Sequence, residues 1–243
     1  MPNSGGKAGA QKERRVNEFG RAFAGSQRQI QTYPNLRPVE LSHKVLELLR
    51  PPPYPSIRLK WVSPLATENF KEYRDEDFLR VLGLQEHASA LREYWPEGGP
   101  SWDALAQLEL DSGISVVLVE AKSHISELNS QCQAQNPESV AKIAEALSET
   151  KNWLSVEHCC DWTKPYYQTA NRFAHLHFLR KNAIQAWLVN VYFLNDPHFT
   201  DGTAPREPGE WQLAIEDVAK ALGLQGRDVP YTGKLYLQAS KGY

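Results

Sequence analysis

The stretch WDALAQLELDSGISVVLVEAK, residues 102–122, decides the fold. Two runs rich in aliphatic residues flank an Asp-Ser dipeptide, which is typical of a β-hairpin with a two-residue turn. Such a turn pairs Leu110 with Gly113, and the same register places Asp103 opposite Glu120. A three-residue loop would instead turn Glu120 to the other face, unless a bulge restored the register.

Side chains alternate between the two faces of this hairpin. Both faces are mostly apolar, which predicts a strand pair covered on both sides. The first face carries Trp102, Ala104, Ala106, Leu108, Leu110, Val117, Val119 and Ala121. The second face carries Asp103, Leu105, Gln107, Val116, Leu118, Glu120 and Lys122. The charged groups of the second face therefore gather at one end of the hairpin.

Asp103, Glu120 and Lys122 are the candidate functional residues at this end. Burial of such charges without partners costs several kcal/mol, so they must pair or hold an ion. One interpretation is an internal ion pair between the lysine and the carboxylates. The other is a metal site, because two neighbouring carboxylates suit a hard cation such as Mg²⁺ and a lysine beside bound water assists its activation.

The remaining sequence predicts an α/β fold with a mixed central sheet flanked by helices. Apolar residues at helical spacing, alternating strands and breaker residues mark the elements. Asn136 and Pro137 are typical of a helix start. Helices are expected at 39–49, 64–82, 85–95, from 136, at 165–181 and from 211, and strands at 56–63, 186–194 and 234–239.

We expect two regions along the chain. Residues 1–37 form a basic, mobile N-terminal extension, since they hold seven basic residues against two acidic ones and begin with a Gly-rich stretch. The extension is a solvated tail, or an arm that contacts phosphate. Residues 38–243 are expected to form a single α/β domain.

The pattern of Asp103 followed by Glu120-Ala121-Lys122 on a hairpin resembles the PD-(D/E)XK nuclease superfamily. The resemblance covers about residues 56–195 and implies a restriction-endonuclease-like core, built from a helix, a three-strand meander, a helix and a further strand. It also implies hydrolysis of nucleic-acid phosphodiester bonds with Mg²⁺ or Mn²⁺. The residue before the acid is Trp102, where the family pattern has proline.

Carried over position by position, the resemblance assigns roles to four residues. Asp103 and Glu120 are the metal carboxylates, the backbone carbonyl of Ala121 is a further ligand, and Lys122 positions the water. Members of the family often add an acid from the first helix. The candidates here are Glu68, Glu72, Asp75, Glu76 and Asp77. Among them Asp77 is favoured, because it shares a helical stripe with Phe70 and Tyr73; the alternative is that these acids form a solvated face of the helix.

Two further groups are expected to support the site. Gln168, Asn171, Arg172 and His175 are spaced as one stripe of a helix, and the guanidinium of Arg172 suits phosphate best. These residues hydrogen-bond the metal carboxylates, hold a phosphate, or serve only structural contacts or solvent exposure. His124 projects on the same side as Lys122 if the strand continues, which makes it a supporting group or a surface histidine.

Composition limits the function classes. The net charge is -2, which excludes a strongly basic nucleic-acid coat while leaving room for a local basic patch. The three cysteines favour reduced thiols and a cytoplasmic location over a disulfide framework. No signal peptide and no membrane span are expected, since no run approaches about 18 apolar residues.

Three functions remain open on this evidence. The first is a metal-dependent nuclease that acts on nucleic acid, with DNA favoured. The alternative is a catalytically inactive nuclease-fold module that binds nucleic acid or a protein partner, with Glu120 and Lys122 kept as an ion pair. The third is a metal-assisted hydrolase of another phosphate compound.

Overall fold

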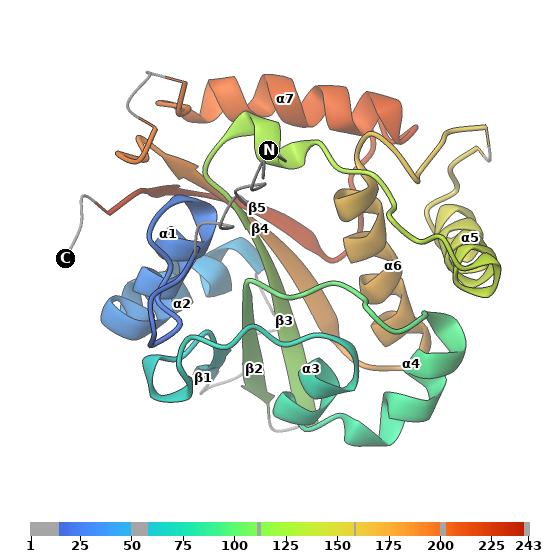
Figure 1. Cartoon of the computed structure of the whole chain (residues 1–243), viewed down its shortest axis with the longest axis horizontal. Helices are drawn as coiled ribbons and strands as arrows, with labels where there is room; N and C mark the ends of the chain where they lie inside the picture. The colour runs from blue at the N-terminus through green and yellow to red at the C-terminus, as the bar shows by residue number, and fades with distance from the viewer. Residues whose placement is uncertain (1–14, 50–57, 111–112, 158, 200–202, 241–243) are drawn as a thin grey trace, which may run out of the picture.

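A five-stranded mixed sheet organises the chain (Figure 1). The computed structural model describes residues 15–49, 58–110, 113–157, 159–199 and 203–240. The strands lie in chain order across the sheet, with β2 antiparallel to β1 and β3, and with β3, β4 and β5 parallel. They are β1 (Arg58–Ser63), β2 (Ala104–Leu110), β3 (Gly113–Lys122), β4 (Ala186–Leu194) and β5 (Thr232–Gln238).

The register of the β2–β3 hairpin matches the sequence prediction. Leu110 pairs with Gly113 and Ala104 with Val119, so the three-residue loop is wrong. The two faces also separate as expected, since Leu105 packs in one core cluster and Ala106 in the other. Trp102 is the exception, because its ring lies in the cluster of Leu105 rather than that of Ala104. The chain enters β2 only at Ala104, so strand alternation does not extend to this residue.

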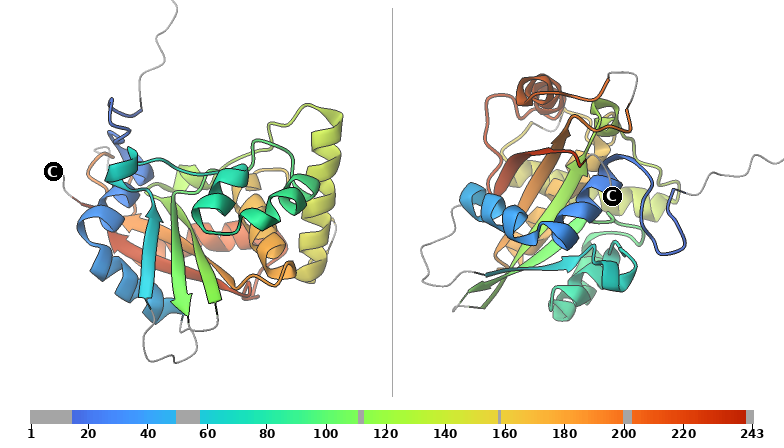
Figure 2. Two further views of the ribbon diagram at one scale, coloured as in Figure 1. Left: turned by 90° about the horizontal axis from the view of Figure 1, so that it is seen from below. Right: turned by 90° about the vertical axis from the view of Figure 1, so that its left-hand side faces the viewer.

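Helices cover both faces of the sheet (Figure 2). The face that carries Ala106 is covered by two helices, α1 (Gly25–Leu36) and α2 (Pro38–Leu49). The face that carries Glu120 is covered by α6 (Tyr167–Lys181) and α7 (Pro208–Ala221), and α5 (Pro137–Trp153) packs on the outer side of α6. The predicted α/β class is therefore confirmed.

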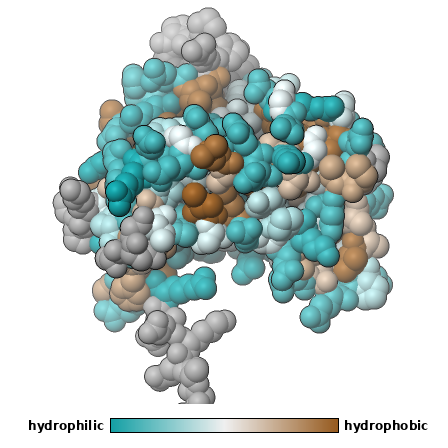
Figure 3. Space-filling model, turned by 90° about the horizontal axis from the view of Figure 1, so that it is seen from above, coloured by the Kyte–Doolittle hydropathy of each residue, from teal (hydrophilic) through white to brown (hydrophobic). Residues whose placement is uncertain are grey.

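Seen over α7, the surface is mostly hydrophilic with a small hydrophobic group at its centre (Figure 3).

Several predicted elements appear with shorter bounds. The helix expected over 64–82 is wrong in its first half, because Asn69 and Phe70 have left-handed backbones with φ of 52° and 53°. The helix expected over 85–95 is a 3₁₀ turn followed by a short α-helix. The short elements here are η1 (Ala66–Glu68), α3 (Asp75–Val81), η2 (Gln85–His87) and α4 (Ala88–Tyr94), and η3 (Ile125–Leu128) follows β3.

The N-terminal extension is not a tail over its whole length. In α1 the side chains of Ile30 and Tyr33 are buried against the sheet, and the Tyr33 hydroxyl donates to the carbonyl of Gln238 at 2.7 Å. The predicted boundary at residue 37 is therefore wrong for this helix, which belongs to the core. Residues 1–14 of the predicted extension lie outside the described residues.

Replacement of Ile30 by alanine tests this position. The side chain is fully buried, so we expect Ile30→Ala to lower the free energy of unfolding by about 2–5 kcal/mol through lost burial and the cavity left behind. The control is Val39→Ala, whose side chain is exposed and whose loss should stay within about 0.5 kcal/mol. Urea unfolding measures both. Equal stability of the two variants would mean that α1 is not docked in solution.

Candidate active site

The predicted acid and the end of β3 meet directly. Asp103 precedes β2, and its Oδ2 accepts a hydrogen bond from the backbone N–H of Ala121 at 2.7 Å. This bond ties the start of one strand to the end of the next and turns the carboxyl toward the Glu120–Lys122 segment. Ala121 contributes its amide to this contact, while the role of its carbonyl as a ligand stays a prediction.

Glu120 lies at the centre of a buried charge network. The ammonium of Lys122 donates to its Oε1, and Nε of Arg172 donates to its Oε2 at 2.5 Å. All three residues are almost sealed from solvent, with relative exposures of 5% for Glu120, 8% for Lys122 and 3% for Arg172. Lys122 also donates to Oε1 of Gln168 at 2.9 Å. Two of the stripe residues on α6 are thus brought to the hairpin as predicted.

Arg172 holds α6 against the chain that enters β2. Its Nη1 donates to Oδ1 of Asn171 at 2.9 Å, and its Nη2 donates to the carbonyl of Ser101 at 2.9 Å. The guanidinium also lies 4.9 Å from the ring centre of Trp102, a cation–π contact. Trp102, the residue before Asp103, therefore packs against the arginine of the site. Within the described residues, Asn171 contacts the site through Arg172 rather than through the carboxylates.

Asp77, the acid that helical spacing favours, lies at the surface rather than beside Glu120. The side chain of Asp77 is 44% exposed and pairs with Arg80 at 2.6 Å, away from the site. Glu72 is the acid that approaches Glu120 instead. It accepts hydrogen bonds from Nε2 of Gln27 at 2.8 Å and from the hydroxyl of Ser101 at 3.3 Å.

The position of Glu72 follows from local backbone structure. This segment is extended rather than helical, and its neighbour Tyr73 forms a bridge with Trp102. Glu72 therefore lies beside Ser101, close to Asp103. It was among the sequence candidates, but a helical stripe cannot identify an acid that belongs to no helix.

His124 does not support Lys122. Its Nδ1 accepts from the backbone N–H of Ser126 at 3.1 Å, and its Nε2 lies 2.8 Å from the hydroxyl of Thr203. The imidazole thus caps η3 and stacks near Phe199. The prediction fails because the strand ends at Lys122, so the alternation of side chains stops before His124.

Burial and neighbouring charges shift the pKa values of the site residues in different directions. Burial raises the pKa of Glu120, but Arg172 and Lys122 outweigh burial and lower it overall. Burial lowers the pKa of Lys122, but the carboxylates of Glu120 and Asp103 raise it overall. For Asp103, burial and the nearby Glu120 both raise the pKa, to well above its usual value. Burial likewise raises the pKa of Glu72. The pKa shifts of Glu120 and Lys122 therefore favour their charged forms, and the shift of Asp103 favours its neutral form.

Comparison with known proteins adds no relationship. No family model, curated protein or solved structure matches this chain. Within the described residues, every helix is too short or too polar to span a membrane. The assignment of function therefore depends on the residues and their geometry.

The site offers the type of ligand atom that a hard cation prefers. Asp103 and Glu120 offer carboxylate oxygens, and Mg²⁺ is commonly held by one or two carboxylates with waters in the remaining positions. Across the part of the chain that the structure describes, no group of three or more His, Cys, Asp or Glu side chains is arranged to hold a metal ion. Both oxygens of Glu120 are bound by cationic side chains, so a metal would share them with Lys122 and Arg172.

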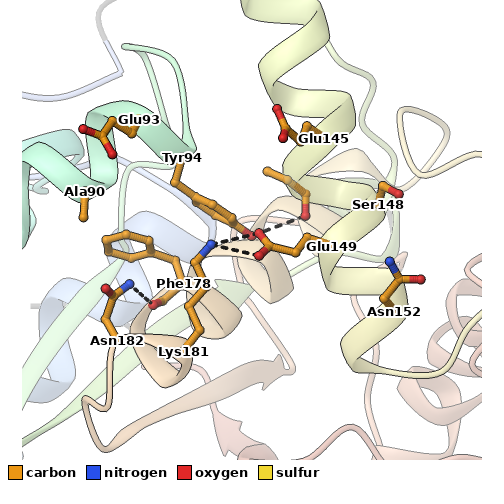
Figure 4. A pocket seen from close by; sticks show the side chains of 11 residues that line it. Ala90, Glu93, Tyr94, Glu145, Ser148, Glu149, Asn152, Phe178, Lys181 and Asn182 are labelled. Carbon is orange, nitrogen blue, oxygen red and sulfur yellow. Dashed lines mark hydrogen bonds and ion pairs between the residues drawn. The ribbon is translucent and has the colours of Figure 1, made fainter.

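A separate hollow of about 560 Å³ lies between α4, α5 and α6 (Figure 4). Lys181 crosses it to Glu149, with Nζ 2.9 Å from Oε2, and lies over the ring of Tyr94. Neither the hairpin acids nor Lys122 line this hollow. The hollow is therefore separate from the candidate site.

Proposed function

We propose that the protein is a metal-dependent hydrolase of nucleic-acid phosphodiester bonds, with DNA as the favoured substrate. The observation that carries the proposal is the convergence of Asp103, Glu120 and Lys122 at one end of the β2–β3 hairpin. Within residues 56–195, the β1–β2–β3 meander is followed by α6 and β4, which is the order that the PD-(D/E)XK resemblance implies after its first helix and which supports the proposal. A restriction-endonuclease-like core is part of this proposal.

The cofactor of the proposed enzyme is Mg²⁺ or Mn²⁺. Asp103 and Glu120 would hold the ion, with the Ala121 carbonyl as the further ligand that the resemblance implies. A bound divalent cation supplies Lewis-acid polarisation of the phosphoryl oxygen and a lower pKa for bound water. Asp103 must lose its proton to bind a cation, and its raised pKa makes binding stronger as pH rises.

The side chains around the ion have distinct tasks. Lys122 keeps its proton because Glu120 and Asp103 raise its pKa, so it acts as a hydrogen-bond donor that orients water or a phosphate oxygen rather than as a base. Gln168 fixes the ammonium by accepting one of its hydrogen bonds. Arg172 is a positioning residue, since it holds Glu120 and the chain before β2 in place.

Cleavage of supercoiled plasmid with Mg²⁺, Mn²⁺ or EDTA tests the proposal. We expect cleavage only with divalent metal, and a loss of about 100-fold or more in Lys122→Met, since removal of one donor to developing charge costs about 10²–10³-fold. Lys60→Met is the control, because this exposed lysine of β1 lies outside the site. Circular dichroism confirms that both variants fold. The proposed enzymatic function is overturned if the wild-type protein cleaves neither duplex DNA, single-stranded DNA nor RNA with any of these metals.

One observation favours the alternative of an inactive nuclease-fold module that binds nucleic acid or a protein. Lys122 and Arg172 already occupy both oxygens of Glu120 as ion pairs. Calorimetric titration with Mg²⁺ and Mn²⁺ separates the two functions, since only the enzyme requires cation binding. Cleavage of bis(p-nitrophenyl) phosphate without cleavage of any nucleic acid would point instead to a hydrolase of small phosphate compounds.

A further inference from the structure

A pocket of about 540 Å³ lies on the same face of the sheet as Glu120. It lies between α6, α7 and the last two strands, β4 and β5, and is separate from the hollow of Figure 4. Its volume falls in the range of about 300–1,000 Å³ that is typical of small-molecule sites. Its apolar wall includes Phe173, Tyr192, Ile215, Val218, Leu222 and Leu224.

The strand register places this pocket beside the candidate active site. Glu120 pairs with Asn190 on β4, and Asn190 pairs with Lys234 on β5. Paired residues of neighbouring parallel strands share a face and lie about 4.8 Å apart. An acid, an amide and an ammonium therefore follow one another across three strands, and the last two line the pocket. On α6 the pocket residue Thr169 directly follows Gln168, which binds Lys122.

The polar groups of the pocket are available for a ligand. Asn190 is partly exposed, and the described residues provide no hydrogen-bond partner for its side-chain amide. Lys234 is exposed, and within the described part of the chain it has no acidic partner. Arg227 and Asp228 at the rim carry opposite charges, so Lys234 gives this edge a net positive charge.

We propose that this pocket binds one nucleotide of the nucleic-acid substrate, with the base inside and the phosphate at Lys234. An Asn amide presents a donor and an acceptor side by side, which matches the edge of a base such as adenine. Phe173 and Tyr192, which are nearly buried in the wall, give the base an apolar surface to pack against. An ammonium at the rim binds phosphate. The inference rests on the proposed function, because it places the nucleotide next to the bond to be cleaved.

Calorimetric titration of the full chain with the four deoxynucleoside 5′-monophosphates, without metal, tests the pocket. We expect at least one to bind with a Kd below about 1 mM. Asn190→Leu should weaken that binding by about tenfold, since a base contact discriminates by about 1–3 kcal/mol. Lys234→Ala should weaken nucleotide binding but leave binding of the matching nucleoside unchanged. Lys220→Ala is the control, because this exposed lysine of α7 does not line the pocket.

The outcomes separate this inference from the proposed function. Absence of nucleotide binding, or binding that neither Asn190→Leu nor Lys234→Ala weakens, overturns the pocket even if the protein cleaves DNA. Inorganic phosphate that binds as tightly as the nucleotides also overturns it, because the base would then contribute nothing. Nucleotide binding in a protein that never cleaves supports the pocket and rejects only the catalytic proposal.

Discussion

Asp103→Asn is expected to abolish metal-dependent cleavage while making the metal-free protein more stable. The variant loses the anionic oxygen that would bind the cation, and the loss of several kcal/mol of transition-state stabilisation corresponds to about a thousandfold in rate. Its amide oxygen can still accept the hydrogen bond from Ala121. Stability rises because the substitution removes a carboxyl that is costly to ionise beside Glu120.

The pH dependence of this variant follows from the raised pKa of Asp103. A carboxyl whose pKa is higher in the folded than in the unfolded state stabilises the fold below the unfolded pKa, and this contribution is lost as pH rises through the folded pKa. The stability advantage of Asp103→Asn should therefore grow from acidic to neutral pH. Thermal unfolding across this range, with and without Mg²⁺, measures the effect, and Mg²⁺ should stabilise only the wild type.

Asp77→Asn is the matched control for this experiment. It removes the acid that periodicity favoured but that pairs with Arg80 at the surface, so cleavage and metal binding should be unchanged. Wild-type activity in Asp103→Asn would show that Asp103 is not a catalytic residue. An equal decrease in activity in Asp77→Asn would show that the effect of Asp103→Asn is not specific to the site.

Glu120→Gln is expected to cost about 3–5 kcal/mol of unfolding free energy. The substitution leaves the charges of Lys122 and Arg172 buried without their counter-charge, and a buried pair broken on one side has a cost of this size. Glu149→Gln is the control, because it breaks a surface pair with Lys181 and should cost at most about 1 kcal/mol.

The sign of the pH effect is opposite to that for Asp103. The pKa of Glu120 is lowered in the folded protein, so its contribution to stability is present above the unfolded pKa and is lost as pH falls through the folded pKa. The difference between wild type and Glu120→Gln should therefore shrink in acid. Urea unfolding at neutral and acidic pH checks this. Similar losses of unfolding free energy in Glu120→Gln and Glu149→Gln would mean that the buried network contributes no more to stability than a surface ion pair.

The hairpin and its partner helix were predictable because their signals are local. Two residues between alternating runs set the register, and helical spacing places Gln168 and Arg172 on one stripe of α6. Two left-handed residues break the helix that was expected to present Asp77, and no periodicity reveals such a break. The burial of α1 depends on tertiary packing of Ile30 and Tyr33 among polar neighbours, which composition alone does not predict.

The two ends of α1 face different parts of the molecule. Ile30 and Tyr33 belong to the core beneath the sheet, while Gln27 binds Glu72 and Ser26 donates to Glu127 near the end of β3. A shortened version of the protein that begins at residue 38 would lose the core packing of Ile30 and Tyr33. It would also lose the hydrogen bond that holds Glu72 near the candidate site. A minimal folded fragment of the protein must therefore keep this helix intact.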